Sequence, residues 1–212
     1  MARDPRHVIL EASGGESGKM TETRDFRVRA YMAKSTALFM RDTFGEQELD
    51  RILFSVSPGA RAAATSGKPA DWCPAVEFSE LLRALAAKSD GNSEHARVRL
   101  IACGEFIARE ATNTFLKIAM KMLTPSLFAK KLPDIWKRDC SGGTFEVDAA
   151  RDKIAFRLSG MAGFDHVPCT AAGFVKFALG AMGKTVDQVQ IQGWSLENPC
   201  ADGARVELTW KA

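Results

Sequence analysis

The spacing of apolar residues changes once along the chain, from a helical period of about 3.6 to a strand period of 2. In the first part, apolar positions recur every three or four residues, as in Phe78, Leu81 and Leu85. From Thr144 to Trp210, apolar and polar residues alternate in short runs, which is typical of strands. The pattern therefore predicts an α+β fold, a helical N-terminal two-thirds packed on a C-terminal antiparallel four-stranded β-β-α-β-β module.

The longest helical run begins at Asn92 or Ser93 and reaches Met122. Its apolar positions are Leu100, Cys103, Ile107, Ala111, Phe115, Ile118 and Met122. One helix of this length would be a rod of ~45 Å, longer than the ~34 Å diameter of a domain of this size. We therefore expect it to kink or to reach past the core into a partner. Pro125 ends the run, and Pro133 divides the next segment into two short turns.

The C-terminal module reads as two hairpins around one helix. The alternating runs 144–148 and 153–158 are separated by four residues, a length typical of a hairpin connection. An amphipathic helix follows, with Gly183 at its expected C-terminal cap. The runs 189–193 and 204–210 then supply two more strands. Polar residues occupy the opposite face of each run, which suits a one-sided antiparallel sheet.

Composition is that of an ordinary globular chain, with 46% hydrophobic residues, 26% charged residues and a net charge of +3. The 212 residues suit one domain. We place it at residues 26–212, after a polar, glycine-rich segment that predicts a flexible leader at residues 1–25. No apolar run approaches the ~18 residues of a membrane span. Five widely spaced cysteines without a CxxC motif indicate reduced thiols and a cytoplasmic location.

The strongest candidate for chemistry is Asp165-His166, followed three residues later by Cys169. A carboxylate beside an imidazole can fix its tautomer, and a Cys–His pair can make a nucleophile. His-x-x-Cys could also supply two metal ligands, but a zinc site needs more, and only Cys140 or Cys200 is on offer. A loop histidine and a buried cysteine explain the pattern more simply. We therefore predict no catalytic residue, no metal and no cofactor, and keep an enzyme using Cys169 and His166 as an alternative.

Basic residues gather in one segment against a single acid, Asp134. They are Lys117, Lys121, Lys130, Lys131, Lys137 and Arg138. An anionic membrane surface or nucleic acid could use such a patch, and a surface-binding module is the second alternative. Solvated faces of short helices are the commoner explanation, and the small net charge gives no reason to expect nucleic acid.

Two phrases carry a resemblance to a known family: WCPAVEF at 72–78, and LTPSLFAKKLPDIW at 123–136 followed by GGTFEV at 142–147. They resemble phrases of a lineage-restricted bacterial family of unknown function. That family is similar to the 4-vinyl reductase domain, the TRAPP vesicle-tethering subunits and the haem NO-binding domains. The shared fold is a helical layer against an antiparallel sheet, and the resemblance covers roughly Phe26 to Trp210.

The resemblance implies an apolar pocket between helices and sheet. Its expected lining is Cys103, Phe106, Ile107, Phe156, Phe174 and Phe177. TRAPP-like subunits hold an acyl chain attached to a cysteine, a place that Cys103 could take, although an ordinary core cysteine explains it more simply. Haem is not expected, because no histidine lies inside the long helix and His95 stands at its start. Cys200 alone stands where 4-vinyl reductase domains carry two cysteines, so that turn is not expected to bind a metal.

These observations favour a non-enzymatic regulatory or scaffold domain that binds a small apolar ligand. We expect a homodimer, because of the long helix and because of the related folds. Neither the ligand nor a protein partner follows from the sequence.

Overall fold

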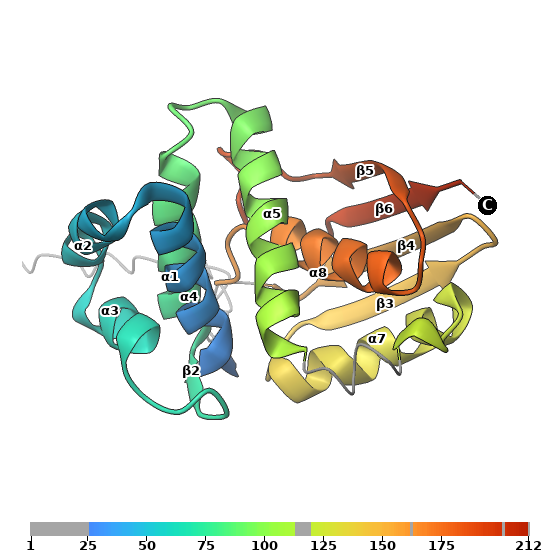
Figure 1. Ribbon diagram of the computed structural model, residues 1–212, viewed down its shortest axis with the longest axis horizontal. Helices are drawn as coiled ribbons and strands as arrows, with labels where there is room; N and C mark the ends of the chain where they lie inside the picture. Colours follow the sequence, from blue (N-terminus) through green and yellow to red (C-terminus); the bar gives the residue numbers. More distant parts are fainter. Residues whose placement is uncertain (1–25, 113–119, 162, 201, 212) are drawn as a thin grey trace, which may run out of the picture.

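Short helices build the N-terminal half of the domain. The computed structural model describes residues 26–112, 120–161, 163–200 and 202–211 of the chain. The first elements are β1 (Arg27–Arg29), α1 (Ala30–Phe44), α2 (Glu46–Ser55), α3 (Pro58–Thr65), β2 (Trp72–Pro74), α4 (Ala75–Ala87) and α5 (Ser93–Ala111). Helices α1 to α4 lie together on one side of α5, which stands between them and the C-terminal half (Figure 1). The predicted leader, residues 1–25, lies outside the described residues.

The C-terminal half contains a four-stranded antiparallel sheet. Its elements are α7 (Pro125–Asp139), β3 (Thr144–Ala149), β4 (Lys153–Ser159), α8 (Val167–Ala181), β5 (Val186–Gln192) and β6 (Arg205–Trp210). The strand order is β3-β4-β6-β5, and every neighbouring pair is antiparallel. Helix α8 crosses one face of the sheet, and α7 runs along its β3 edge (Figure 1). The α+β fold and the β-β-α-β-β module are therefore confirmed.

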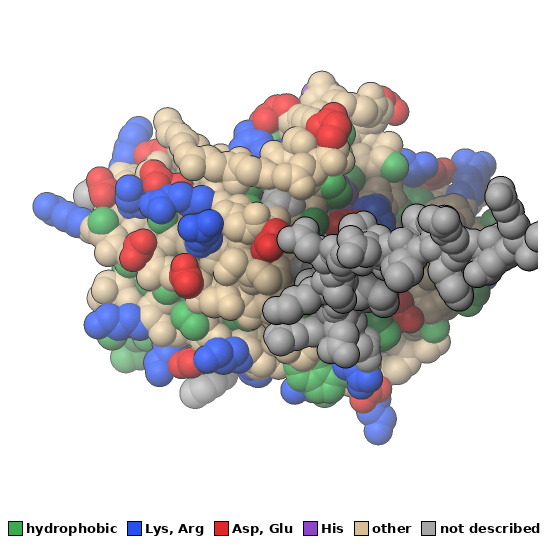
Figure 2. Space-filling view, turned by 180° about the vertical axis from the view of Figure 1, so that it is seen from behind, with side chains coloured by type: hydrophobic (Ala, Val, Ile, Leu, Met, Phe, Trp, Pro, Cys, Tyr) green, Lys and Arg blue, Asp and Glu red, His purple; other side chains and the backbone are tan. Residues whose placement is uncertain are grey.

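Alternation along the strands gives the sheet one buried face and one polar face. The buried side chains include Ile154, Phe156, Leu158, Val206 and Leu208. On the opposite face Lys153 and Glu207 form an ion pair at 3.4 Å between Nζ and Oε2. Figure 2 looks onto this face from behind, and side chains of both charge signs are interspersed on it. One hydrophobic layer therefore lies between the sheet and α8.

Helices α5 and α8 pack with their backbones in contact, because a glycine stands on each at the crossing. A Cβ on Gly104 would lie 2.1 Å from the carbonyl oxygen of Thr170. A Cβ on Gly173 would lie 2.0 Å from the carbonyl oxygen of Ile101. Only glycine permits such close approach of two backbones. The crossing joins the N-terminal helices to the sheet layer.

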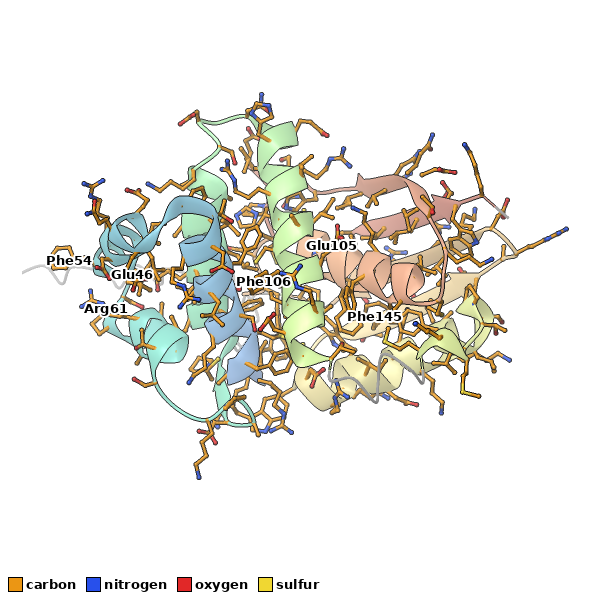
Figure 3. All side chains as sticks on the ribbon, in the orientation of Figure 1. Glu46, Phe54, Arg61, Glu105, Phe106 and Phe145 are labelled. Atoms are coloured by element: carbon orange, nitrogen blue, oxygen red, sulfur yellow. The ribbon has the colours of Figure 1, made fainter. Side chains whose placement is uncertain are left out.

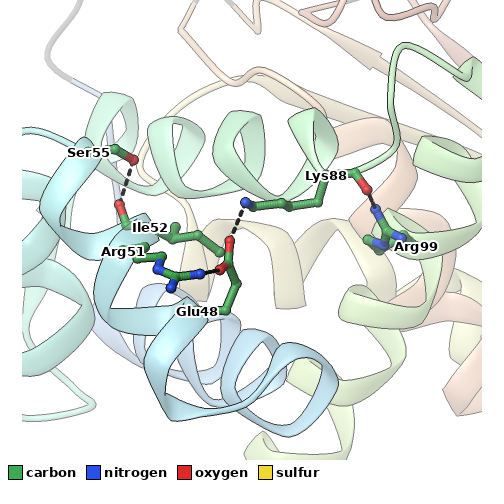
Figure 4. A network of polar contacts seen from close by, with 6 residues as sticks. All are labelled: Glu48, Arg51, Ile52, Ser55, Lys88 and Arg99. Atoms are coloured by element: carbon green, nitrogen blue, oxygen red, sulfur yellow. Dashed lines mark hydrogen bonds and ion pairs between the residues drawn. The ribbon is translucent and has the colours of Figure 1, made fainter.

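A polar network on the surface joins α2, the end of α4 and α5 (Figure 4). The Glu48 carboxylate accepts hydrogen bonds from Lys88 and from Arg51, the latter at 3.0 Å. These bonds lower the pKa of Glu48, with Lys88 the larger cause. The carbonyl of Lys88 in turn accepts a hydrogen bond from Arg99. Surface pairs of this kind add little stability each.

Of the two expectations for the run from Asn92 to Met122, a kink or a straight rod that reaches past the core, the straight rod is wrong. Helix α5 ends at Ala111, and Thr112 is extended at φ −103° and ψ 107°. The hydroxyl of Thr112 donates to the carbonyl of Ala108 at 2.6 Å. A β-branched residue whose hydroxyl competes for backbone groups is a weak helix former, which accounts for the break. Residues 113–119, with two of the predicted stripe positions, lie outside the described residues.

The predicted division of the next segment at Pro133 is also wrong, because α7 runs without interruption through it. The helix begins as expected: the hydroxyl of Thr124 accepts from the backbone N–H of Leu127 at 3.3 Å, and Pro125 fits the first turn. Proline removes one backbone hydrogen bond from a helix interior. Burial of Phe128 and Leu132 on one face holds the helix together across that loss.

Two three-residue strands were not predicted. Strand β1 pairs antiparallel with β2, and Val28 at its centre also bridges to Cys140 at the end of α7. Runs this short carry no readable alternation. The bridge joins the beginning of the described chain to the end of α7.

Candidate functional site

A small apolar cavity lies where helices α1, α5, α7 and α8 meet strand β3. Its volume is ≈ 70 Å³. Most of its wall is apolar and includes Val28, Met32, Phe78, Ile107, Leu132, Ile135, Trp136, Phe145, Phe164, Val167, Ala171, Phe174 and Val175. Gly104 contributes bare backbone to the same wall. The cavity therefore adjoins the α5–α8 crossing.

One side of the cavity wall is polar, and its groups bond to one another. The Tyr31 hydroxyl donates to Oδ2 of Asp139 at 3.1 Å. Arg138 donates to both oxygens of the same carboxylate, at 2.9 and 2.6 Å. A buried carboxylate is costly unless it is paired and hydrogen-bonded. Asp139 is buried and satisfied, so the wall presents few unpaired polar atoms to the cavity.

Burial and the Asp139 charge keep the other titratable groups of this wall neutral. Burial raises the pKa of Tyr31 well above its ordinary value, and the Asp139 carboxylate adds to the shift. Burial also raises the pKa of the Cys140 thiol, again with a contribution from Asp139. A thiol is a weak nucleophile and a weak metal ligand. The cavity wall is thus suited to holding an uncharged molecule.

Tyr31 is the only tyrosine in the chain, so its ionisation can be followed directly. We expect no tyrosinate absorbance in the folded protein as the pH rises past 10, and a single rise when the protein unfolds. Because the folded pKa is raised, the stability from this group is complete below pH 10 and is lost as the pH rises further. Absorbance at alkaline pH, read beside far-UV circular dichroism, checks this. Tyrosinate forming while the helices persist would contradict it.

The structure separates the six residues predicted to line a pocket. Ile107 and Phe174 line the cavity. Cys103 and Phe106 face α1 instead: Cys103 Sγ lies 3.8 Å from Oγ1 of Thr36, and the Phe106 ring packs edge-on against Phe39. Figure 3 shows Phe106 on the α1 side of α5 and Glu105 on the α8 side. Acylation of Cys103 stays a prediction.

The other two predicted residues, Phe156 and Phe177, do not line the cavity. Phe156 stacks on Phe145, with ring centroids 4.7 Å apart, and so stands one layer behind the wall. Phe177 lies further along α8, beside a separate groove. Sequence periodicity missed Tyr31 and Asp139, which are 108 residues apart and meet only through the fold. The lone tyrosine was the one sequence signal that could have drawn attention to them.

Among the described residues, no hydrogen bond joins the side chains of His166 and Cys169. Both are buried, and Nδ1 of His166 has no hydrogen-bond partner among the described residues. Burial raises the pKa of the Cys169 thiol and lowers that of His166 to about 4. Neither residue belongs to the cavity wall described above. The geometry therefore gives the alternative of an enzyme using this pair no support.

The structure divides the predicted basic patch. Arg138 donates a hydrogen bond to the carboxylate of Asp139. Lys121, Lys130 and Lys131 are exposed around the start of α7. Lys117 lies outside the described residues. Among those residues, no group of three or more His, Cys, Asp or Glu side chains could hold a metal ion. No helix in the described ranges is both long enough and apolar enough to cross a membrane.

Comparison with known proteins identifies the fold. No family model and no curated protein matches the chain. Among solved structures, the Fe(II) unliganded H-NOX protein of K. algicida matches with a TM-score of 0.64 at 12% identity, over 87% of this chain and 97% of that one. The S. oneidensis H-NOX protein in its Fe(II)NO state gives 0.60 at 12% identity, covering 87% and 99%. A mutant of the T. tengcongensis H-NOX gives 0.59 at 12%, covering 87% and 98%.

The chain therefore has the fold of the H-NOX, or haem NO-binding, domains. This is the relation to haem NO-binding domains predicted from the sequence, and it is confirmed at the level of fold. Identity of 11–13% carries the fold alone. The predicted relations to 4-vinyl reductase domains and TRAPP subunits stay predictions.

Proposed function

We propose that this chain is a non-enzymatic sensor or scaffold domain that takes a small, uncharged, apolar ligand in the cavity beside Gly104. The observation that carries the proposal is the apolar wall closed on one side by the mutually bonded Tyr31 and Asp139. A dry cavity of about 150 Å³ holds a molecule the size of benzene. A cavity of ≈ 70 Å³ suits a molecule of a few heavy atoms.

The solved neighbours are haem proteins by name, and the residues of this chain do not fit haem. Haem iron is held by His, Cys, Met or Tyr side chains. Tyr31, Met32 and Cys140 belong to the described cavity wall, and none of its described residues is a histidine. The Tyr31 hydroxyl is bonded to Asp139, and raised pKa values keep both it and the Cys140 thiol protonated. The cavity is also far below the ~300–1,000 Å³ of pockets for larger ligands.

The position of the cavity supports a sensing role. Its wall takes residues from the α5–α8 crossing, from α7 and from the sheet. A ligand that binds only the folded state stabilises it by mass action. Occupancy of this cavity would therefore change how firmly the helical half and the sheet half are held together.

Xenon tests the cavity, because it is apolar and small. We expect saturable xenon-dependent shifts in the amide NMR spectrum, centred on Ile107, Ala171 and Phe174. The variant Ala171→Phe should abolish them by filling the space, at a stability cost of about 1–3 kcal/mol for overpacking. Ala87→Phe, on the exposed end of α4, is the matched control and should bind xenon as the wild type does. Equal shifts in Ala171→Phe and wild type, or no saturable shift in the wild type, would refute the proposal.

Homodimerisation also remains a proposal. One ground for it was a long helix that would extend into a partner, and α5 ends at Ala111 in the described residues. The related folds are the remaining ground for a homodimer.

A cytoplasmic location is also a proposal, and it rests on the cysteines alone: the five are free, and four of them are buried.

A further inference from the structure

Three apolar side chains stand exposed at the start of α7. Met122 is 83% exposed, Leu127 is 51% exposed and Leu123 is 36% exposed. Single exposed apolar residues need no explanation, but several together mark an interaction site. With the neighbouring lysines they form a basic-apolar surface, defined here as Lys121, Met122, Leu123, Leu127, Lys130 and Lys131.

Helical geometry explains why this surface faces away from the core. Phe128, Ala129 and Leu132 occupy the buried face of α7. Leu127, Lys130 and Lys131 are related by three and four residues, so they share the opposite face. The exposed leucine therefore stands directly beside two lysines, the arrangement of an interfacial helix face.

The lysines of this surface are free to meet anions. No ion pair among the described residues involves Lys121 or Lys130. Lys131 approaches Asp134 at 3.9 Å, with both side chains about 70% exposed, a contact worth little. The positive charge is therefore not neutralised within the described part of the molecule.

A groove extends the same positive character towards the end of α8. Lys121 borders it together with Lys176 and Lys184, and its volume is ≈ 470 Å³. Phe177 and neighbouring small residues give it an apolar floor. Among the described residues that line it, Glu105 is the one acid, and it pairs with Lys176 at 2.6 Å. Two lysines of the groove thus remain unneutralised by that acid.

We propose that the basic-apolar surface docks on the face of an anionic phospholipid bilayer. Met122 and Leu127 would enter the boundary between headgroups and acyl chains, as the apolar side of an interfacial segment does. Lys121, Lys130 and Lys131 would lie at the level of the lipid phosphates. The side chains at the centre of the surface are aliphatic, which favours lipid. Single-stranded nucleic acid is usually bound by aromatic rings on which the bases stack. The proposal is independent of what the cavity binds.

Flotation with lipid vesicles tests this surface. The full chain should float with phosphatidylcholine vesicles that contain phosphatidylglycerol, and not with phosphatidylcholine alone, and added salt should weaken the binding. Lys130→Ala/Lys131→Ala should lower the partition coefficient by about 30-fold. Met122→Ser/Leu127→Ser should lower it by more than about tenfold while keeping all three lysines.

A matched control lies at the other end of the molecule. Arg51→Ala/Phe54→Ser removes one exposed cation and one 83% exposed ring from α2, far from α7 (Figures 1 and 3). It should float as the wild type does, and circular dichroism should show every variant folded. Two results would overturn the proposal at once: no flotation with anionic vesicles, or an equal loss of flotation in the control variant. A third would assign the surface to nucleic acid instead: DNA competes the wild type off the vesicles, and Met122→Ser/Leu127→Ser binds that DNA with wild-type affinity.

Discussion

Gly104→Ala and Gly173→Ala are each expected to lower the free energy of unfolding by more than about 3 kcal/mol, at the upper end of overpacking costs. The added Cβ would lie about 2 Å from a carbonyl oxygen of the facing helix. Those oxygens belong to backbone that is itself held in a helix, so no side-chain rotation can relieve the clash. The helices must separate, and the cavity beside Gly104 must change shape with them.

Gly180→Ala is the matched control, because Gly180 lies in the same helix as Gly173 and a Cβ there would meet nothing within 4 Å. It should stabilise the protein by about 0.5–1 kcal/mol, since alanine is the better helix former. Denaturant unfolding of the three variants measures the contrast, with an unchanged slope showing that the change is in stability. A Gly104→Ala protein as stable as the wild type would mean that α5 and α8 are not in backbone contact.

Stability should fall by on the order of 3 kcal/mol between pH 6.5 and pH 4 because of His166. The side chain is 3% exposed, and burial lowers its pKa to about 4, outweighing the attraction of Asp165. Above pH 6.5 the imidazole is neutral in both states. As the pH falls through this window the unfolded chain binds a proton that the folded protein does not, so unfolding is favoured.

His166→Asn should flatten this dependence, and His95→Asn should not. Asparagine tolerates the left-handed backbone found at residue 166, where φ is 62°. His95 is exposed in the first turn of α5. Urea midpoints at pH 7 and pH 4.5 for the two variants and the wild type decide the matter. An equally steep loss in His166→Asn would assign the acid sensitivity to other groups.

The sheet module was predictable because each of its strands has one polar face, which makes apolar and polar residues alternate along the sequence. The runs around Phe145 and Phe156 alternate in sequence, and the short gap between them favours a hairpin, which the structure closes with the three residues 150–152. For helix α5 the same pattern does not predict which residues line the cavity. It is buried on two sides, so an apolar residue signals burial without saying which neighbour it meets. Cys103 and Phe106 turned to α1, whereas Ile107 reached the cavity.

The polar side of the cavity could not be predicted, because it depends on distant contacts. In the sequence, Tyr31 is an ordinary aromatic residue of a helix and Asp139 is an acid at the end of another. Only the fold brings the two side chains into contact. The passage of α7 through Pro133 depended on tertiary packing against local preference. Strands β1 and β2, of three residues each, are too short for a pattern to exist.

Strand β1 has a mechanical consequence. Val28 lines the cavity and bridges to Cys140, while the backbone of Arg27 exchanges hydrogen bonds with Ser141 at 2.8 and 2.9 Å. Phe26, just before the strand, packs its ring against Phe164 of the cavity wall. Tension applied to the polypeptide at Phe26 therefore reaches the cavity within two residues. A probe attached there would lie beside two side chains of the cavity wall, Val28 and Phe164.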